Sequence, residues 1–288
     1  MTDKSKKTHQ HVIENPWQTL NAFTDARIGL GRAGVSVPTH HLLAFQLAHA
    51  KAQDAVHQAL DVEALVVAAL AMDEAARQLL PQDAPPFVLH SQAVDRPTYL
   101  QRPDLGRQLD SASIKTLTDF MSENPTSERG DFDLAIVIAD GLSSLAIEQN
   151  ALAFLQKLKQ ALSETEQTWH IAPLSFVQQG RVAVGDEVGE ALKANAVLMM
   201  IGERPGLSSP DSMGLYLTWA PKKGTLDSSR NCISNVRSAG LSYQAAAKKL
   251  VYLLQESRKR KLTGVNLKER SDQALSQKAV KPNNQFLL

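Results

Sequence analysis

Short, uninterrupted apolar runs in the second half of the chain constrain its fold more than any other feature. These runs are Leu134–Ala139, Ile171–Val177, Ala196–Ile201 and Leu215–Trp219. Segments with helical periodicity lie between or after them, over Leu142–Leu162, Gly185–Asn195 and Ser242–Leu262. Strands that alternate with helices form parallel sheets, and continuous apolar strands are typical of sheets that are buried on both faces. The sequence therefore predicts an α/β protein with a Rossmann-like open parallel sheet.

The first half of the chain has a different pattern. Thr39–Leu80 is rich in good helix formers and contains no Pro or Gly, so we expect helix there, with a break near Leu60–Asp61. A short helix is expected over Ser111–Ser122, after the irregular stretch Phe87–Leu109. We predict the following domain organisation: a disordered tail over 1–14, a mainly helical N-terminal region over 15–130, the Rossmann-like domain over 131–270 and a disordered tail over 271–288.

Composition excludes several classes of protein. The chain has 288 residues, of which 43% are hydrophobic, so it can bury a sizeable core. Its net charge of +1 argues against nucleic acid as a partner. The single cysteine excludes an internal disulfide framework and a multi-cysteine zinc site, and it fits a reducing, cytoplasmic location. The longest apolar stretch, Ala64–Met72, is too short to span a membrane, which takes about 20 residues.

Two motifs favour structural interpretations. Gly29–Gly34 matches G-x-G-x-x-G, but no apolar strand precedes it, so we interpret it as a tight loop in which Arg32 contacts a partner or ligand rather than a nicotinamide. The basic run Arg258–Lys261 complements the negative end of the last predicted helix. The sequence contains no recognisable acid, base, nucleophile or metal-ligand constellation, so we assign no catalytic and no metal-binding residue.

Loops at the expected carboxyl ends of strands give the best indication of a site. Asp140–Ser144 and Gly202–Leu207 each follow an apolar run, and Arg230–Asn235 is a dense polar segment around the only cysteine. In an open parallel sheet, ligands collect beyond the carboxyl ends of the strands. The residues alone thus predict a cleft for a large ligand.

These loops resemble a known family. Arg102–Arg107, Ile138–Ser143, Gly202–Leu207 and Cys232–Asn235 occur in the same order in the small subunit of ethanolamine ammonia-lyase, and Gly31–Gly34 also fits. The similarity covers about 15–268. It implies a subunit of an adenosylcobalamin-dependent lyase that converts ethanolamine to acetaldehyde and ammonia by radical chemistry. It also implies a hetero-oligomer in which a separate large subunit, a TIM barrel, binds ethanolamine, while the small subunit closes over the cobalamin.

The resemblance further implies cofactor contacts at Val182, Glu203 and Cys232. Glu203 would accept hydrogen bonds from the amide groups or ribose of the cofactor, unless it forms a structural ion pair with Arg181 or Arg204. No D-x-H-x-x-G motif is present, in agreement with a family that keeps the cofactor's own base on cobalt, the base-on form. Many members carry an amphipathic extension for a bacterial microcompartment. Residues 1–10 are too short and polar for one, so we expect a free cytoplasmic enzyme.

Two other functions stay open from the residues alone. One is a stand-alone, nucleotide-binding enzyme on a Rossmann-like domain, and the other is a noncatalytic scaffold that binds another protein through its Ala-rich helices.

Overall fold

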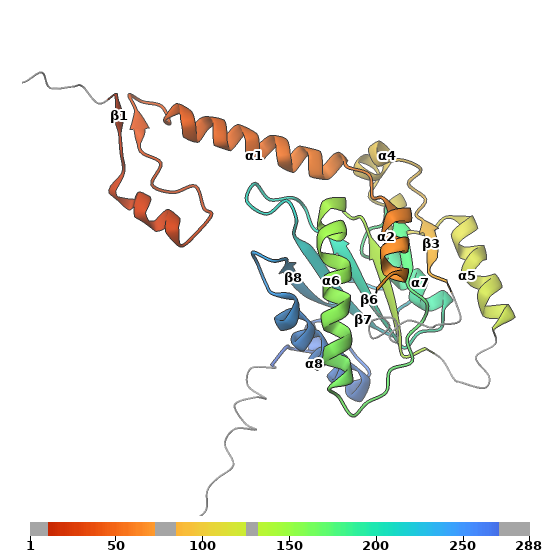
Figure 1. Cartoon of the computed structure of the whole chain (residues 1–288). Coiled ribbons are helices and arrows are strands. Elements are labelled where there is room, and N and C mark those ends of the chain that lie inside the picture. Colours follow the sequence, from red (N-terminus) through yellow and green to blue (C-terminus); the bar gives the residue numbers. More distant parts are fainter. Residues whose placement is uncertain (1–10, 73–84, 125–131, 271–288) are drawn as a thin grey trace, which may run out of the picture.

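The computed structural model describes residues 11–72, 85–124 and 132–270 (Figure 1). The tails expected over 1–10 and 271–288 lie outside these ranges, as do the end of the helix predicted up to Leu80 and most of the segment around the proposed boundary at residue 130. Within the tail expected over 1–14, Val12–Ile13 instead form a short strand, β1, which pairs with β2, Arg32–Ala33.

A six-stranded sheet forms the centre of the molecule, in the order β3-β5-β4-β6-β7-β8. The strands are β3 (Phe87–His90), β4 (Leu134–Ala139), β5 (Ser175–Gln178), β6 (Ala196–Gly202), β7 (Met213–Trp219) and β8 (Arg230–Val236). The first four strands in the sheet order pair in parallel, whereas β7 is antiparallel to both of its neighbours. The α/β class is confirmed, but the sheet is mixed, so the prediction of an all-parallel Rossmann-like sheet is wrong at β7.

The connections around β7 explain the error. Parallel neighbours need a crossover of about a dozen residues or more, usually a helix. The segments 203–212 and 220–229 contain no α-helix, so the chain turns back on itself on each side of β7. β8 occupies the segment around Cys232 that was expected to be a polar loop. One face of this edge strand is exposed and carries polar residues, so no continuous apolar run identifies it as a strand. β3 likewise lies in the stretch that was expected to be irregular.

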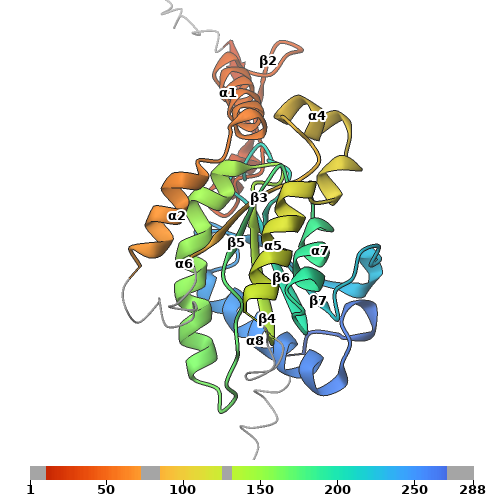
Figure 2. The ribbon, with the colours of Figure 1, turned by 90° about the vertical axis from the view of Figure 1, so that its right-hand side faces the viewer.

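Helices cover both faces of the sheet. α2 (Val62–Leu70) and α6 (Ser144–Ser163) lie side by side on one face together with α8 (Tyr243–Arg260). α5 (Ser111–Glu123) and α7 (Val184–Ala191) lie on the other face (Figure 2). Alternate residues of β4 enter the two separate cores and all are fully buried, which is why this strand reads as one continuous apolar run.

The central sheet and its covering helices contain segments from both sides of residue 130. β3 pairs with β5, and α5 packs on α7. The division of the chain into two domains at that point stays a prediction.

The segment 11–58, which we call the N-terminal arm, leads up to this body. Its main element is α1 (Thr39–His57), which projects from the sheet in Figure 1 and ends before the break expected near Leu60–Asp61. Large apolar side chains are exposed all along the arm: Val12, Ile13, Trp17, Leu20, Phe23, Ile28, Val35, Val37, Leu42, Leu43, Phe45 and Leu47. No helix in the described ranges has both the length and the apolar character needed to cross a bilayer.

Candidate functional site

A cavity lies where the loops after β4, β5 and β6 meet, at the carboxyl ends of these strands. Its volume is about 430 Å³. The residues that line it are Tyr99, Gly141, Leu142, Arg181, Val182, Ile201, Gly202, Glu203, Arg204 and Tyr216. A cavity therefore lies where the sequence predicts a ligand, beyond the carboxyl ends of the parallel strands.

Two glycines let the loops after β4 and β6 pack backbone to backbone at this cavity. Gly141 has a φ of +59°, and a Cβ atom there would collide with the carbonyl oxygen of Gly202. A Cβ on Gly202 would in turn collide with the carbonyl oxygen of Ser143. The Leu142 N–H donates to the Gly202 carbonyl at 2.9 Å. Any larger residue at either position would force the two loops apart.

Glu203 follows β6, and its carboxylate is held by neutral donors. Its backbone N–H donates to the Ser212 carbonyl at 2.9 Å. Its Oε2 accepts hydrogen bonds from the Ser212 hydroxyl and, at 3.2 Å, from the Asn235 N–H. Within the described ranges Glu203 forms no ion pair, so Arg181 and Arg204 do not neutralise it there. Nor does any described residue donate to Oε1, which leaves one carboxylate oxygen available as an acceptor.

Val182 and Cys232 hold different positions relative to the cavity. Val182 lines it and packs against the core beside α7. Cys232 lies on the exposed face of β8, opposite the cavity residue Tyr216. Burial raises the pKa of the Cys232 thiol, a hydrogen bond with Tyr216 partly offsets this, and the charge of Glu203 raises the pKa further. A neutral thiol is a packing contact rather than a nucleophile.

The sequence profile of the ethanolamine ammonia-lyase light chain (EutC) family matches residues 14–268. The chain belongs to this family. It is 51% identical to the ethanolamine ammonia-lyase small subunit of Ralstonia nicotianae, over 94% of this chain and 95% of that one. It is also 51% identical to the small subunit of Pseudomonas aeruginosa, over 96% and 95% of the two chains, and 52% identical to that of Pseudomonas putida, over 90% and 89%. The resemblance first noted in the loop motifs is thus confirmed over most of the light chain.

The context of the glycine motif differs from that of a dinucleotide site. Gly29, Gly31 and Gly34 have positive φ angles and flank the short strand β2, while α1 begins only at Thr39. A dinucleotide site needs a strand directly before the glycines and a helix directly after them. The structure therefore gives the stand-alone nucleotide-binding alternative no support in this family member.

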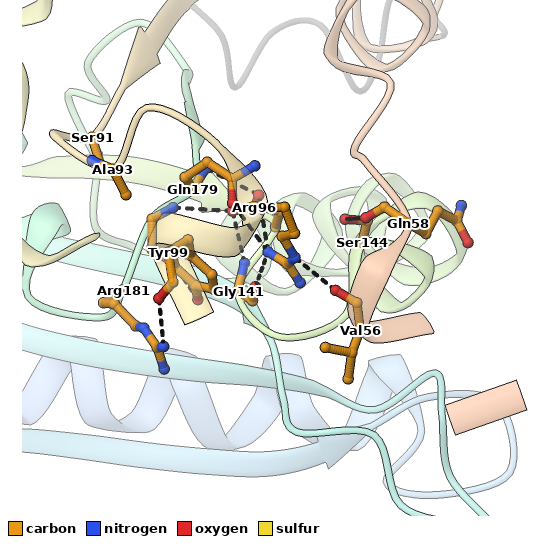
Figure 3. Close-up of polar contacts among 12 residues, drawn as sticks. Val56, Gln58, Ser91, Ala93, Arg96, Tyr99, Gly141, Ser144, Gln179 and Arg181 are labelled. Atoms are coloured by element: carbon orange, nitrogen blue, oxygen red, sulfur yellow. Dashed lines mark hydrogen bonds and ion pairs between the residues drawn. The ribbon is translucent and has the colours of Figure 1, made fainter. Parts of the chain in front are cut away.

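Sequence reasoning missed a buried polar network beneath the cavity. Asp140 accepts hydrogen bonds from the backbone N–H groups of Gly141, Gln179 and Gly180, at 2.9, 3.0 and 3.0 Å (Figure 3). Burial raises the pKa of Asp140, and the positive charge of Arg96 partly offsets this. The turn Ile138–Ser143 did single out Asp140 as a loop residue, but nothing in the sequence indicated its distant partners.

Tyr99 completes this network on the side of the cavity. Its hydroxyl donates to the Gly180 carbonyl at 3.2 Å. The guanidinium groups of Arg96 and Arg181 lie 4.7 and 4.3 Å from the centre of its ring. Burial raises the pKa of the Tyr99 hydroxyl, so it stays protonated and able to donate. Of the described residues, no group of three or more His, Cys, Asp or Glu is placed to hold a metal ion.

Proposed function

We propose that this chain, as the small subunit of ethanolamine ammonia-lyase, closes over adenosylcobalamin with the cavity at the ends of β4, β5 and β6. Val182, Glu203 and Cys232 are the contacts, and the cofactor keeps its own base on cobalt. One observation carries the proposal: Glu203 is anchored through Oε2, while its Oε1 has no donor among the described residues, in a cavity that is also lined by apolar and aromatic side chains and by Arg181 and Arg204.

The residues present fit one side of a cobalamin. The rim of its macrocycle carries several amide groups, which need acceptors, and an ionised carboxylate is a strong one. Val182, Leu142 and Ile201 supply apolar wall, and Gly141 and Gly202 add no side chain to the lining. We infer that this chain covers one side of the cofactor and that the large subunit covers the other.

Bound adenosylcobalamin supplies the radical chemistry of the reaction. The residues of this chain bind and orient the cofactor and exclude water from its edge. From the family resemblance we also propose that ethanolamine is bound mainly by the large subunit.

The exposed apolar side chains of the N-terminal arm support docking on the large subunit. Contiguous apolar surface of this kind is typical of a protein interface. Phe23 and Val35 are among its most exposed residues, and α1 exposes Leu42, Leu43, Phe45 and Leu47 around much of its circumference. The single cysteine agrees with a cytoplasmic assembly, and a microcompartment is not needed for this function.

An absorbance titration tests the proposal. Cyanocobalamin, which cannot support turnover, is added to the large subunit alone and to the complex of both subunits. We expect saturable spectral changes at markedly lower cobalamin concentration for the complex. Equal affinity with and without this chain would contradict the proposed role.

A further inference from the structure

Arg96, the first residue of α4 (Arg96–Gln101), connects the N-terminal arm to the loops of the cavity (Figure 3). Its Nε donates to the carbonyl of Val56 in α1 at 2.6 Å. Its Nη1 donates to the carbonyl of Gly141 at 2.8 Å and to Oε1 of Gln179 at 3.3 Å. The same Nη1 lies 3.5 Å from the carboxylate of Asp140. One guanidinium thus holds acceptors from α1, from the loop after β4 and from the loop after β5.

Burial makes this arrangement consequential. The side chain of Arg96 is 10% exposed and that of Asp140 is 2% exposed. In such a poorly solvated place a charge-assisted hydrogen bond is strong, and losing one partner leaves the others unpaired. The carboxylate of Asp140 also accepts hydrogen bonds from the N–H groups of Gly141, Gln179 and Gly180. The ion pair therefore fixes the two loops that carry Leu142 and Val182 into the cavity.

The end of α1 is attached to the same place by a second set of contacts. The Ser144 hydroxyl, at the start of α6, donates to the carbonyl of Gln58 at 2.8 Å. The side-chain amide of Gln58 donates to Glu148 at 2.8 Å. These contacts fix the end of α1 where Arg96 reaches it. We therefore expect a displacement of the arm to displace the loops of the cavity as well.

We propose that Arg96 is a positioning residue, which couples docking of the N-terminal arm to the shape of the cobalamin cavity. This inference rests on the proposed function. Arg96 is not one of the residues that line the cavity, so it acts through Gly141 and Gln179 rather than by touching the cofactor. Its planar fork serves Val56 and Gly141 at once, which the single ammonium group of a lysine cannot do.

The test compares Arg96→Lys with Arg230→Lys in the complex with the large subunit. Arg230 is a matched control because it is also a buried arginine paired with a buried aspartate, Asp186, each 2% exposed. It starts β8, at the end of the strand away from Asn235 and Glu203. Its partners Asp186, Asp227 and the Thr225 carbonyl do not line the cavity. Each variant is measured by cyanocobalamin titration, by thermal unfolding and by hydrogen exchange of the backbone amides.

We expect Arg96→Lys to weaken cyanocobalamin binding roughly tenfold, as the loss of one charge-assisted hydrogen bond predicts. The amides of Gly141, Gln179 and Gly180 should exchange faster in the same variant. Arg230→Lys should lower the unfolding temperature as much but leave the cobalamin affinity within about twofold of the original. If Arg96 has a purely structural role, the affinity for cobalamin should change by the same factor in both variants, and that result overturns the inference.

A gentler variant keeps the test decisive if Arg96→Lys does not assemble. Gln179→Asn shortens one of the side chains that accept a hydrogen bond from Arg96 Nη1, and asparagine tolerates the φ of +55° at this position. It should weaken cobalamin binding by a few fold without loss of assembly, and unchanged affinity would overturn the inference. If the complex with the original sequence binds no cobalamin, the proposed function fails as well. If that complex binds cobalamin and the Arg96→Lys and Gln179→Asn variants bind it with the same affinity as the original, only the coupling fails.

Discussion

At the scale of single residues, Glu203 is the main polar contact that the proposed function assigns to the cavity. Replacement by glutamine keeps the size of the side chain but removes the charge. We expect Glu203→Gln to raise the dissociation constant for cobalamin roughly fivefold to hundredfold, because about 1–3 kcal/mol of charge-assisted hydrogen bonding is lost. Cyanocobalamin titration of the complex measures this constant. Thermal unfolding shows whether the fold is intact.

Glu256→Gln is the matched control for this prediction. Glu256 pairs with Arg260 on α8, on the surface and away from the cavity. Its replacement should leave cobalamin affinity unchanged. If Glu203→Gln lowers the unfolding temperature and also leaves the affinity unchanged, Glu203 has a structural role only.

Gly214 gives Glu203 its space. A Cβ atom at Gly214 would lie 3.0 Å from Oε1 and 3.2 Å from Cγ of Glu203, so Gly214→Ala must displace the carboxylate by a few tenths of an ångström. We expect weaker cobalamin binding, by several fold, in a protein that still folds. Gly185→Ala is the comparison, because its Cβ meets Met199 at 3.3 Å outside the cavity. Equal affinity in the two variants would show that the position of the carboxylate is unimportant.

The thiol of Cys232 should titrate late. Because loss of solvation and the charge of Glu203 both disfavour the thiolate, its pKa in the folded chain lies above the ordinary value of about 8.5. The rate of alkylation by iodoacetamide, followed against pH, should therefore have its midpoint above that of the same protein in denaturant. A midpoint in the folded chain at or below the denatured value contradicts this account of the site.

At the scale of elements, the sequence predicts best where the environment of a segment is uniform. β4 is buried on both faces, so its apolar run alone identifies it. β8 has an exposed face and polar residues, and it was mistaken for a loop. The direction of β7 depends on the connections that flank it rather than on its own residues.

The same reasoning applies to the site. The family resemblance implies contacts at Val182, Glu203 and Cys232. The structure brings Val182 and Glu203 to one cavity, whereas Cys232 is not among the residues that line it. Arg96 and Tyr99 were not expected, because their partners lie tens of residues away in the sequence and only the folded sheet brings them together. Local patterns report burial and turns, whereas a hydrogen-bond network between distant loops leaves no periodic trace.

The central and edge strands of the sheet predict a contrast in stability. Ile136 in β4 is 0% exposed, and Ile136→Ala should lower the free energy of unfolding by about 2–5 kcal/mol through lost burial and a residual cavity. Val88 in the edge strand β3 is 54% exposed, so Val88→Ala should cost less than about 1 kcal/mol. Urea unfolding of the isolated chain compares them. Similar losses for both would contradict the placement of β4 at the centre of the core.

At the scale of the whole molecule, the proposed docking surface and the proposed cofactor cavity belong to different parts of one chain. The arm exposes apolar side chains that a separate monomer would leave in water, and the body presents a cavity on the carboxyl edge of its sheet. The arm also contacts the loop between β6 and β7, where Arg27 donates to the Leu207 carbonyl and to the Ser208 hydroxyl, each at 3.1 Å. In the proposed assembly, the large subunit covers the exposed apolar side chains of the arm.

Reconstitution of the enzyme tests this account most directly. Acetaldehyde release from ethanolamine is measured with adenosylcobalamin present, for this chain alone, for the large subunit alone and for the two together. We predict turnover only when both subunits are present, because in the proposed function this chain covers the cofactor and the large subunit binds ethanolamine. Turnover by this chain alone, or full turnover by the large subunit without it, would contradict the central claim.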